Sequence, residues 1–205
     1  MTEEIKNLLN ENTSFVKECS LCNDSILKIG SKDSYGAVVI YKIGDSQENS
    51  WFATLSPKTG SNPEKDFTIQ LMPFGHFTHF FQIEKHPELA KNYGLSFSKL
   101  TSAMAKIMAE EQENNPEVLS SSISIATYGK WTNWKPKKEH LHIKLFPFRG
   151  KVGQPCAVDS SFAKKEIFID ERTGEEFVKM NPVRKVHLSK KRFKELSDKL
   201  IHLLK

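Results

Sequence analysis

The sequence predicts an α+β domain: a five-stranded antiparallel sheet with one long helix, followed by a C-terminal hairpin and helix. Three observations predict this fold. Five short runs are rich in β-branched residues or alternate apolar and polar residues with a period of two. One longer stretch, residues 87–113, repeats its apolar residues at helical spacing. Turn-forming residues separate these segments, so each is expected to form its own element.

The composition sets the class of protein. A chain of 205 residues that is 38% hydrophobic predicts one domain, residues 1–205, with a core over 19–150 and an elaboration over 160–205. A net charge of +5 favours anionic ligands. No apolar run approaches the roughly 18 residues of a membrane span, and no basic leader is visible, so we expect a cytoplasmic protein without a membrane partner. Three cysteines do not make a disulfide framework, which indicates a reducing compartment.

The first half of the chain predicts a short helix and three strands. Apolar residues at helical spacing favour an amphipathic helix over residues 2–17, followed by a turn that carries Cys19 and Cys22. Strands are expected over 36–43, 50–55 and 66–72. The stretch 56–65, rich in Pro, Gly, Ser and Asn, is expected to be a loop of a length that often carries function.

The second half begins with the long helix, residues 87–113, whose first turns Gly94 is expected to weaken. A fourth strand follows over 121–128, and a basic loop with two tryptophans over 129–138. Residues 165–170 and 176–180 flank a turn that contains Gly174 and predict a hairpin. Residues 189–204 predict a C-terminal helix with Ser189 as its N-cap.

The fifth strand, residues 139–149, carries the chemistry. Alternation places His140, His142 and Lys144 on one face and apolar residues on the other. Polar groups on this face recur about every 6 to 7 Å, and neutral imidazole is a nucleophile while lysine neutralises phosphoryl oxygens, so a phosphate is the natural ligand. The alternative is a half-exposed strand whose histidines alternate without function. Residues 130–151 hold seven lysines and arginines against the single carboxylate of Glu139, which favours the anion site.

These residues belong to a longer series of motifs. Residues 140–147 read His-Leu-His-Ile-Lys-Leu-Phe-Pro, residues 51–57 end in Thr-Leu-Ser-Pro, and residues 73–76 read Pro-Phe-Gly-His. Together with the Cys-x-x-Cys at residues 19–22, this order resembles the histidine triad (HIT) superfamily of nucleotide hydrolases and transferases. The resemblance covers residues 19–147 and implies a HIT-like fold.

The cysteines and histidines suggest a metal. Cys-x-x-Cys with two distant histidines is sufficient for a tetrahedral zinc site. In zinc-bearing members of the superfamily the ligands are the equivalents of Cys19, Cys22, His76 and His140, which implies a structural zinc and no catalytic metal. His79 competes with His76 for this role, and the two cysteines alone could equally be small buried residues.

The resemblance also implies a mechanism. His142 is the expected nucleophile at the α-phosphate of a nucleotide, dinucleoside polyphosphate, phosphoramidate or nucleotide sugar, with a covalent nucleotidyl-histidine intermediate, and His140 and Lys144 complete the catalytic set. Lys144 is a departure, since hydrolases of the superfamily carry a third histidine there and transferases a glutamine. Thr54 is a second departure, because it stands where the superfamily has a ribose-binding aspartate.

The ligand-binding set is therefore Thr54, Asn133, Lys138 and Lys144 for nucleotide and phosphate. Tryptophans in the loop 129–138 could stack a base or simply be buried. Two classes of function stay open: the enzyme, and a nucleotide- or RNA-binding module on the same fold that has lost turnover. Processing of nucleic-acid ends is a third, which only the basic loop supports. A homodimer is an open alternative to a monomer.

Overall fold

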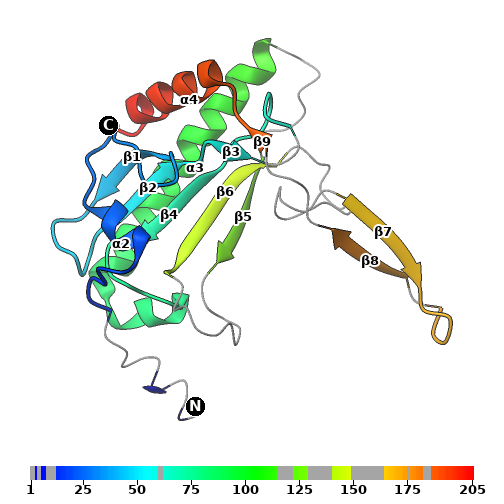
Figure 1. The fold of residues 1–205 in the computed structure, drawn as a ribbon, viewed down its shortest axis with the longest axis horizontal. Helices are drawn as coiled ribbons and strands as arrows, with labels where there is room; N and C mark the ends of the chain where they lie inside the picture. Colours follow the sequence, from blue (N-terminus) through cyan, green and yellow to red (C-terminus); the bar gives the residue numbers. More distant parts are fainter. Residues whose placement is uncertain are drawn as a thin grey trace.

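A computed structural model gives the fold and describes residues 3, 6–7, 13–59, 62–114, 122–128, 140–148, 164–174, 176–181 and 186–205. One sheet has the strand order β1-β2-β4-β6-β5, and every neighbouring pair is antiparallel (Figure 1). The predicted five strands and the α+β class are confirmed. The strands of this sheet are β1 (Val38–Ile43), β2 (Trp51–Leu55), β4 (Ile69–Pro73), β5 (Ser122–Tyr128) and β6 (His142–Phe148).

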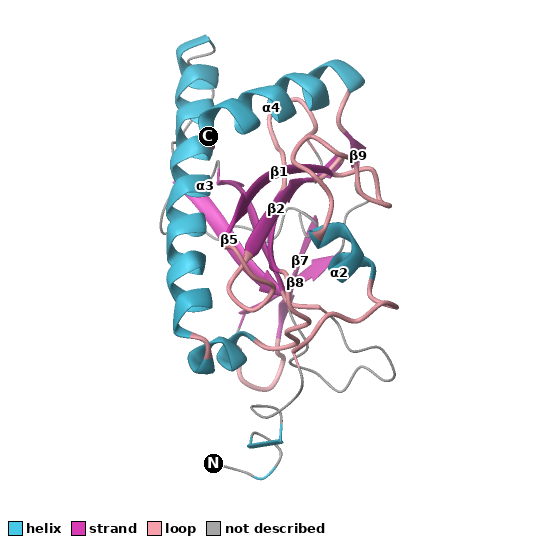
Figure 2. Ribbon diagram, turned by 90° about the vertical axis from the view of Figure 1, so that its left-hand side faces the viewer, coloured by secondary structure: helices cyan, strands magenta, loops and turns pink. Residues whose placement is uncertain are grey.

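The long helix is α3 (Pro87–Asn114), which contacts all five strands of the sheet. Figure 2 shows α3 on one side of the strands and the short helix α2 (Ser20–Ser25) on the other. The helix is not broken at Gly94 or at the serines of its first turns, because α3 continues through them. Burial of Leu89 before the glycine and Leu100 after it outweighs the roughly 1 kcal/mol that glycine costs within a helix.

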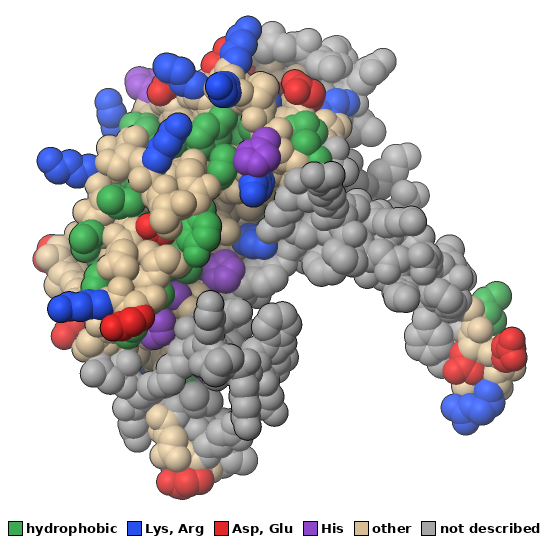
Figure 3. All heavy atoms as spheres, viewed as in Figure 1, with side chains coloured by type: hydrophobic (Ala, Val, Ile, Leu, Met, Phe, Trp, Pro, Cys, Tyr) green, Lys and Arg blue, Asp and Glu red, His purple; other side chains and the backbone are tan. Residues whose placement is uncertain are grey.

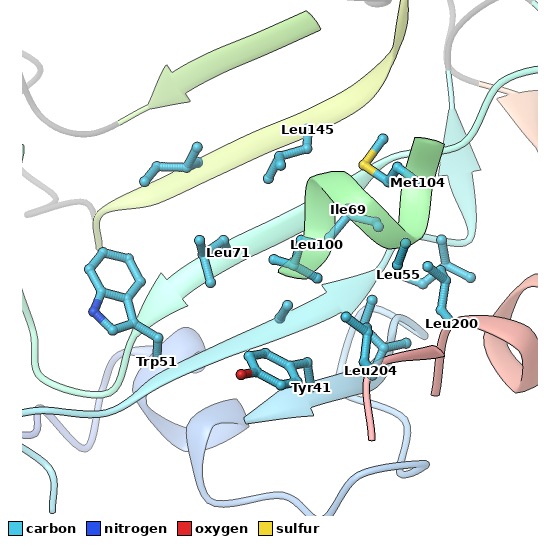
Figure 4. Packing of buried hydrophobic residues seen from close by; sticks show 14 of the residues in the cluster. Tyr41, Trp51, Leu55, Ile69, Leu71, Leu100, Met104, Leu145, Leu200 and Leu204 are labelled. Carbon is cyan, nitrogen blue, oxygen red and sulfur yellow. The ribbon is translucent and has the colours of Figure 1, made fainter. Parts of the chain in front are cut away.

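The hydrophobic core fills the space between the sheet and the two longest helices, α3 and α4 (Lys190–Leu203) (Figure 4). Ser189 caps α4 as predicted, since its hydroxyl oxygen accepts a hydrogen bond of 3.2 Å from the backbone N–H of Arg192. None of the helices in the described part of the chain combines the length and apolar composition that a membrane crossing requires. The fully buried core residues of the sheet include Trp51, Leu55, Ile69, Leu71, Ile143 and Leu145.

Two smaller sheets accompany the large sheet in the described part of the chain. The predicted hairpin is confirmed as β7 (Lys164–Ile169) and β8 (Glu176–Asn181), joined by a turn in which Gly174 has a φ of 72°. The stretch 56–65 is not the uninterrupted loop that we expected. Within it, β3 (Lys58–Thr59) pairs with β9 (Val186–His187) and so ties this segment to the chain that leads into α4. A 3₁₀ helix, η1 (Phe80–Lys85), precedes α3.

The N-terminal expectations need two corrections. Residues 13–17 are not helical, whereas Glu3, Lys6 and Asn7 are, and the other residues of the expected helix over 2–17 lie outside the described residues. The backbone of Thr13 is used elsewhere, because its carbonyl accepts a hydrogen bond of 2.8 Å from the N–H of His76. The cysteines lie at the start of a helix rather than in a turn, with Cys19 as the N-cap of α2.

Candidate functional site

Three separate segments bring the four candidate metal ligands together. Cys19 and Cys22 come from the start of α2, His76 from the loop after β4, and His140 from the residues just before β6. Their donor atoms all lie within 4.8 Å of one another. Three of the four side chains are buried, and Cys19 is half-buried. These are the four residues expected from the sequence.

The distances suit tetrahedral coordination. The Nδ1 atom of His140 lies 3.6 Å from the Sγ atom of Cys19 and 3.5 Å from that of Cys22, and the Nδ1 atom of His76 lies 3.5 Å from the Sγ of Cys22. A tetrahedral site with metal–sulfur bonds of about 2.3 Å and metal–nitrogen bonds of about 2.0–2.1 Å has sulfur–nitrogen edges of about 3.6 Å. The cluster could therefore bind a metal such as zinc.

The imidazole of His140 is oriented for this role. Its Nε2 atom lies 2.8 Å from the carbonyl oxygen of Pro73, which can only accept, so Nε2 carries the hydrogen. The lone pair of the neutral ring is then on Nδ1, which faces both sulfur atoms. The rings of His76 and His140 are nearly perpendicular, with centroids 5.4 Å apart. A backbone carbonyl that fixes the tautomer of a ligand histidine is a common feature of metal sites.

The two cysteines have opposite protonation tendencies. The pKa of Cys19 is lowered, chiefly by its hydrogen bond with Cys22 and further by hydrogen bonds with His140 and His76. The pKa of Cys22 is raised by the same contact with Cys19 and by burial. The contact between the two sulfur atoms thus favours the thiolate on Cys19 and keeps the proton on Cys22. Metal ligation requires both thiolates, so binding would release that proton.

A close backbone approach positions the loop that carries His76. A Cβ atom added at Gly75 would lie 2.7 Å from the carbonyl oxygen of Thr13, which is closer than side-chain atoms approach, so only glycine fits there. The same loop is joined to the start of β6, where the N–H of Leu141 donates to the carbonyl of Phe77 over 2.6 Å. These two contacts hold His76 and His140 in place relative to α2.

His142 begins β6, two residues after His140. Its Nδ1 atom lies 3.0 Å from the carbonyl oxygen of His140, so Nδ1 is the donor and the lone pair of the neutral ring is on Nε2. Both His142 and Lys144 are half-buried, whereas Ile143 between them is fully buried in the core. The predicted alternation of faces is confirmed. The ring of His140 is buried in the Cys/His cluster, whereas His142 and Lys144 on β6 are half-buried.

A polar row crosses the sheet beside His142. Thr54 on β2 is in register with Gln70 on β4, and Gln70 is in register with Lys144 on β6. We call the sheet side that holds Thr54, Gln70, His142 and Lys144 the Lys144 face. The hydroxyl of Thr54 is buried and has no hydrogen-bond partner among the residues that the structure describes. An orphaned hydroxyl of this kind favours a polar ligand at that position. Figure 3 shows histidine side chains with lysine or arginine beside them at the surface.

Two residues near the site were missed by the sequence analysis. Gln70 was predictable, because alternation along β4 places it opposite the core face of Ile69 and Leu71. Asp24 was not, since nothing in its sequence context separates it from a surface carboxylate. Its side chain is buried on α2, and burial, together with the charge of Asp33, raises its pKa to about 6.

Other predicted residues are separated from this site or fall outside it. The His79 imidazole contacts the hydroxyl of Thr78 over 2.8 Å and does not belong to the metal cluster, so the competition with His76 is resolved in favour of His76. Asn133 and Lys138, predicted to bind the nucleotide, lie outside the described residues.

Comparison with known proteins adds no identification. No protein-family model matches the chain, and neither a curated protein nor a solved structure matches it.

Proposed function

We propose that this chain is a HIT-like nucleotidyl hydrolase or transferase that acts at the α-phosphate of a nucleotide through His142. The observation that carries the proposal is the hydrogen bond between His142 Nδ1 and the carbonyl of His140. It holds the His142 ring in the tautomer whose Nε2 lone pair can attack phosphorus. A neutral imidazole in a fixed orientation is the form that nucleophilic catalysis requires.

The reaction would proceed in two displacements. His142 Nε2 attacks the α-phosphorus, the bond to the leaving group breaks, and a nucleotidyl-imidazole forms. Water or phosphate then attacks the same phosphorus, and the imidazole departs with its electron pair. The carbonyl of His140 stabilises the positive ring that exists between the two steps, because it accepts the hydrogen bond from Nδ1.

The Cys/His cluster would serve this chemistry indirectly. Cys19, Cys22, His76 and His140 would hold a structural zinc, which supplies folding free energy and leaves no open coordination position for a substrate. The cluster is linked to His142 through His140. The ring of His140 belongs to the cluster, and its backbone carbonyl contacts His142. A cluster that fixes the start of β6 therefore fixes the nucleophile.

The Lys144 face would bind the rest of the nucleotide. Thr54 presents a buried hydroxyl and Lys144 a cation on the same side of the sheet as His142. A hydroxyl binds a ribose less strongly than a carboxylate does, because a carboxylate accepts hydrogen bonds from two hydroxyls. Thr54 and Lys144 therefore also favour a second candidate, a nucleotide-binding module on the same fold without turnover.

One experiment separates the two candidates. The protein is incubated with dinucleoside polyphosphates, nucleoside phosphoramidates and nucleotide sugars, without added metal, and its intact mass is measured. The enzyme gains the mass of one nucleotidyl group, whereas His142→Asn gains none and keeps its nucleotide affinity within about tenfold. His202→Asn, an exposed histidine on α4, is the matched control and should form the adduct normally. Nucleotide binding without an adduct from any substrate would favour the binding module.

A further inference from the structure

A hollow that is open to solvent lies between η1 and the first turns of α3. It has a volume of about 400 Å³, and its lining combines apolar and aromatic side chains with one carboxylate: Phe80, Phe81, Ile83, Glu84, Ala90 and Tyr93. Phe80 is 43% exposed, so an aromatic surface is presented to solvent there. We call this hollow the Glu84 pocket. It offers a ligand aromatic rings and a negative charge.

Two of the rings in the lining are perpendicular neighbours. The ring centroids of Phe80 and Tyr93 lie 5.2 Å apart, and the ring planes meet at 76°. Tyr93 is held in place by ring contacts with Trp51 and Phe97, at 5.2 and 5.7 Å. A cation in the pocket would lie within about 6 Å of the centroid of at least one ring, the distance at which the negative face of an aromatic ring attracts a positive charge.

The backbone around the Glu84 pocket is fixed before any ligand binds. The side-chain oxygen of Gln82 accepts hydrogen bonds of 2.9 Å from the N–H groups of Thr78 and His79, which holds the start of η1. On α3, Ala90 precedes Tyr93 by three residues, so both lie on one face of the helix. The small side chain of Ala90 leaves room beside the ring. A preformed site of this kind loses little free energy to ordering when a ligand enters.

Glu84 is the only charged residue in the described lining. Its side chain is exposed, and no hydrogen bond or ion pair joins it to another residue that the structure describes. By contrast, Glu88 in the first turn of α3 pairs with Lys91 over 3.2 Å. An unpaired carboxylate attracts cations and repels phosphates. The Glu84 pocket is therefore unsuited to the nucleotide that we propose for the Lys144 face.

We propose that the Glu84 pocket binds the quaternary ammonium headgroup of an organic cation. A guanidinium or a primary ammonium carries several N–H donors, which would lose their hydrogen bonds to water against a largely apolar lining. A quaternary ammonium has no N–H group, so it loses none, and its methyl groups gain by burial against the rings. The carboxylate of Glu84 balances its charge. This inference does not depend on the role of His142.

The test compares choline with 3,3-dimethylbutan-1-ol, its neutral isostere in which carbon replaces nitrogen. The two ligands have nearly the same shape and differ in charge. NMR titration of the full chain, followed at the backbone amides of residues 80–84 and 90–93, measures both affinities. We expect choline to bind at least about fivefold more tightly than the alcohol. Equal affinities would overturn the proposal, and so would choline that leaves these amides unshifted at saturating concentration.

Three variants and a control assign the effect to the pocket. Glu84→Gln should lower the affinity for choline and leave that for the alcohol unchanged. Phe80→Leu, which keeps an apolar side chain without a ring, should also reduce the preference for choline. Ala90→Leu should fill the pocket and abolish binding of both ligands. Glu88→Gln is the matched control, because it removes a nearby exposed carboxylate outside the lining. An equal loss in Glu88→Gln and Glu84→Gln would overturn the site, since any surface carboxylate would then serve.

A pair of peptides separates two sources of the same headgroup. A short peptide with trimethyl-lysine carries the headgroup on a protein side chain, and the same peptide with unmodified lysine carries a primary ammonium. Tighter binding of the methylated peptide than of choline would identify a protein side chain as the ligand, and the reverse order would identify a small molecule. Preference for the unmodified peptide over the methylated one would overturn the proposal, because Glu84 alone would then hold the cation.

Discussion

The two faces of the sheet differ in what they do, although they alternate residue by residue along the same strands. On the face under α3 and α4, Leu71 and Ile143 are fully buried among apolar side chains. On the Lys144 face, their neighbours Gln70, His142 and Lys144 are half-buried and polar. Neighbouring residues on one strand therefore serve different purposes: one stabilises the core, and the next belongs to the proposed site. His140 would contribute to both, because its ring belongs to the Cys/His cluster and its backbone carbonyl contacts His142.

The largest expected effect is removal of the Cys/His cluster. Cys22→Ser should abolish binding of about one zinc per chain and lower the free energy of unfolding by more than about 3 kcal/mol, because a structural metal contributes its binding energy to folding. Elemental analysis and urea unfolding measure both. Cys156→Ser, at the third cysteine of the chain, should change neither. A Cys22→Ser protein of unchanged stability would contradict the metal centre.

Truncation of a side chain on the core face should have the second-largest effect on the free energy of unfolding. Leu71→Ala should cost about 2 to 5 kcal/mol of folding free energy, because it leaves a cavity among fully buried residues. Gln70→Ala, the adjacent residue on the Lys144 face, should cost less than about 1 kcal/mol and weaken nucleotide binding instead. Urea unfolding with ligand titration measures the pair. Equal stability costs at the two positions would contradict the separation of the faces.

Removal of the ion pairs of α4 should have smaller effects on the free energy of unfolding. Arg192 and Glu111 join α4 to α3 at 2.9 Å, with only 17% and 22% of their side chains exposed. Arg192→Met should cost about 1 to 2 kcal/mol, because it removes a charge-assisted hydrogen bond from a poorly solvated carboxylate. Lys194→Met, which removes the exposed pair with Asp198 within α4, should leave the free energy of unfolding almost unchanged. The reverse ranking in urea unfolding would show that α4 does not depend on the contact with α3.

The smallest expected effect is a pH dependence of the free energy of unfolding that arises from a tyrosine in the core. Burial raises the pKa of Tyr41, so its folded pKa lies above its unfolded value of about 10. The stability that this group contributes is therefore complete below pH 10 and falls as the pH rises through the folded pKa. Tyr41→Phe should lose less stability than the unaltered protein between pH 8 and pH 11. Parallel losses in the two proteins would place the alkaline sensitivity elsewhere.

Local signals predicted most of the fold. Alternation gave the strands, helical spacing gave α3, and Ser189 marked the start of α4. The pairing of β3 with β9 could not be predicted, because two-residue strands have no periodicity and their partners are far apart in the sequence. The helix predicted over residues 2–17 does not include residues 13–17, for a related reason. The bond between Thr13 and His76 is a long-range contact that outweighs local helical spacing.

The candidate site also has features that the sequence predicts and features that it does not. The identities of the four cluster residues followed from the motif resemblance, and the structure brings those residues together. The direction of the His142 ring could not be predicted, because a backbone carbonyl sets it. Alternation along β4 is sufficient to place Gln70 beside Lys144, although a neutral amide carries no charge or nucleophile that marks a site in the sequence.

The central claim is that the carbonyl of His140 holds the Nδ1 atom of His142 and so directs Nε2 to phosphorus. The most direct measurement is the phosphorus NMR spectrum of the trapped adduct after digestion, since the two nitrogens of a phosphorylated imidazole give distinct signals. The account predicts a single adduct on Nε2 of His142. An adduct on Nδ1, or on another residue, would contradict it.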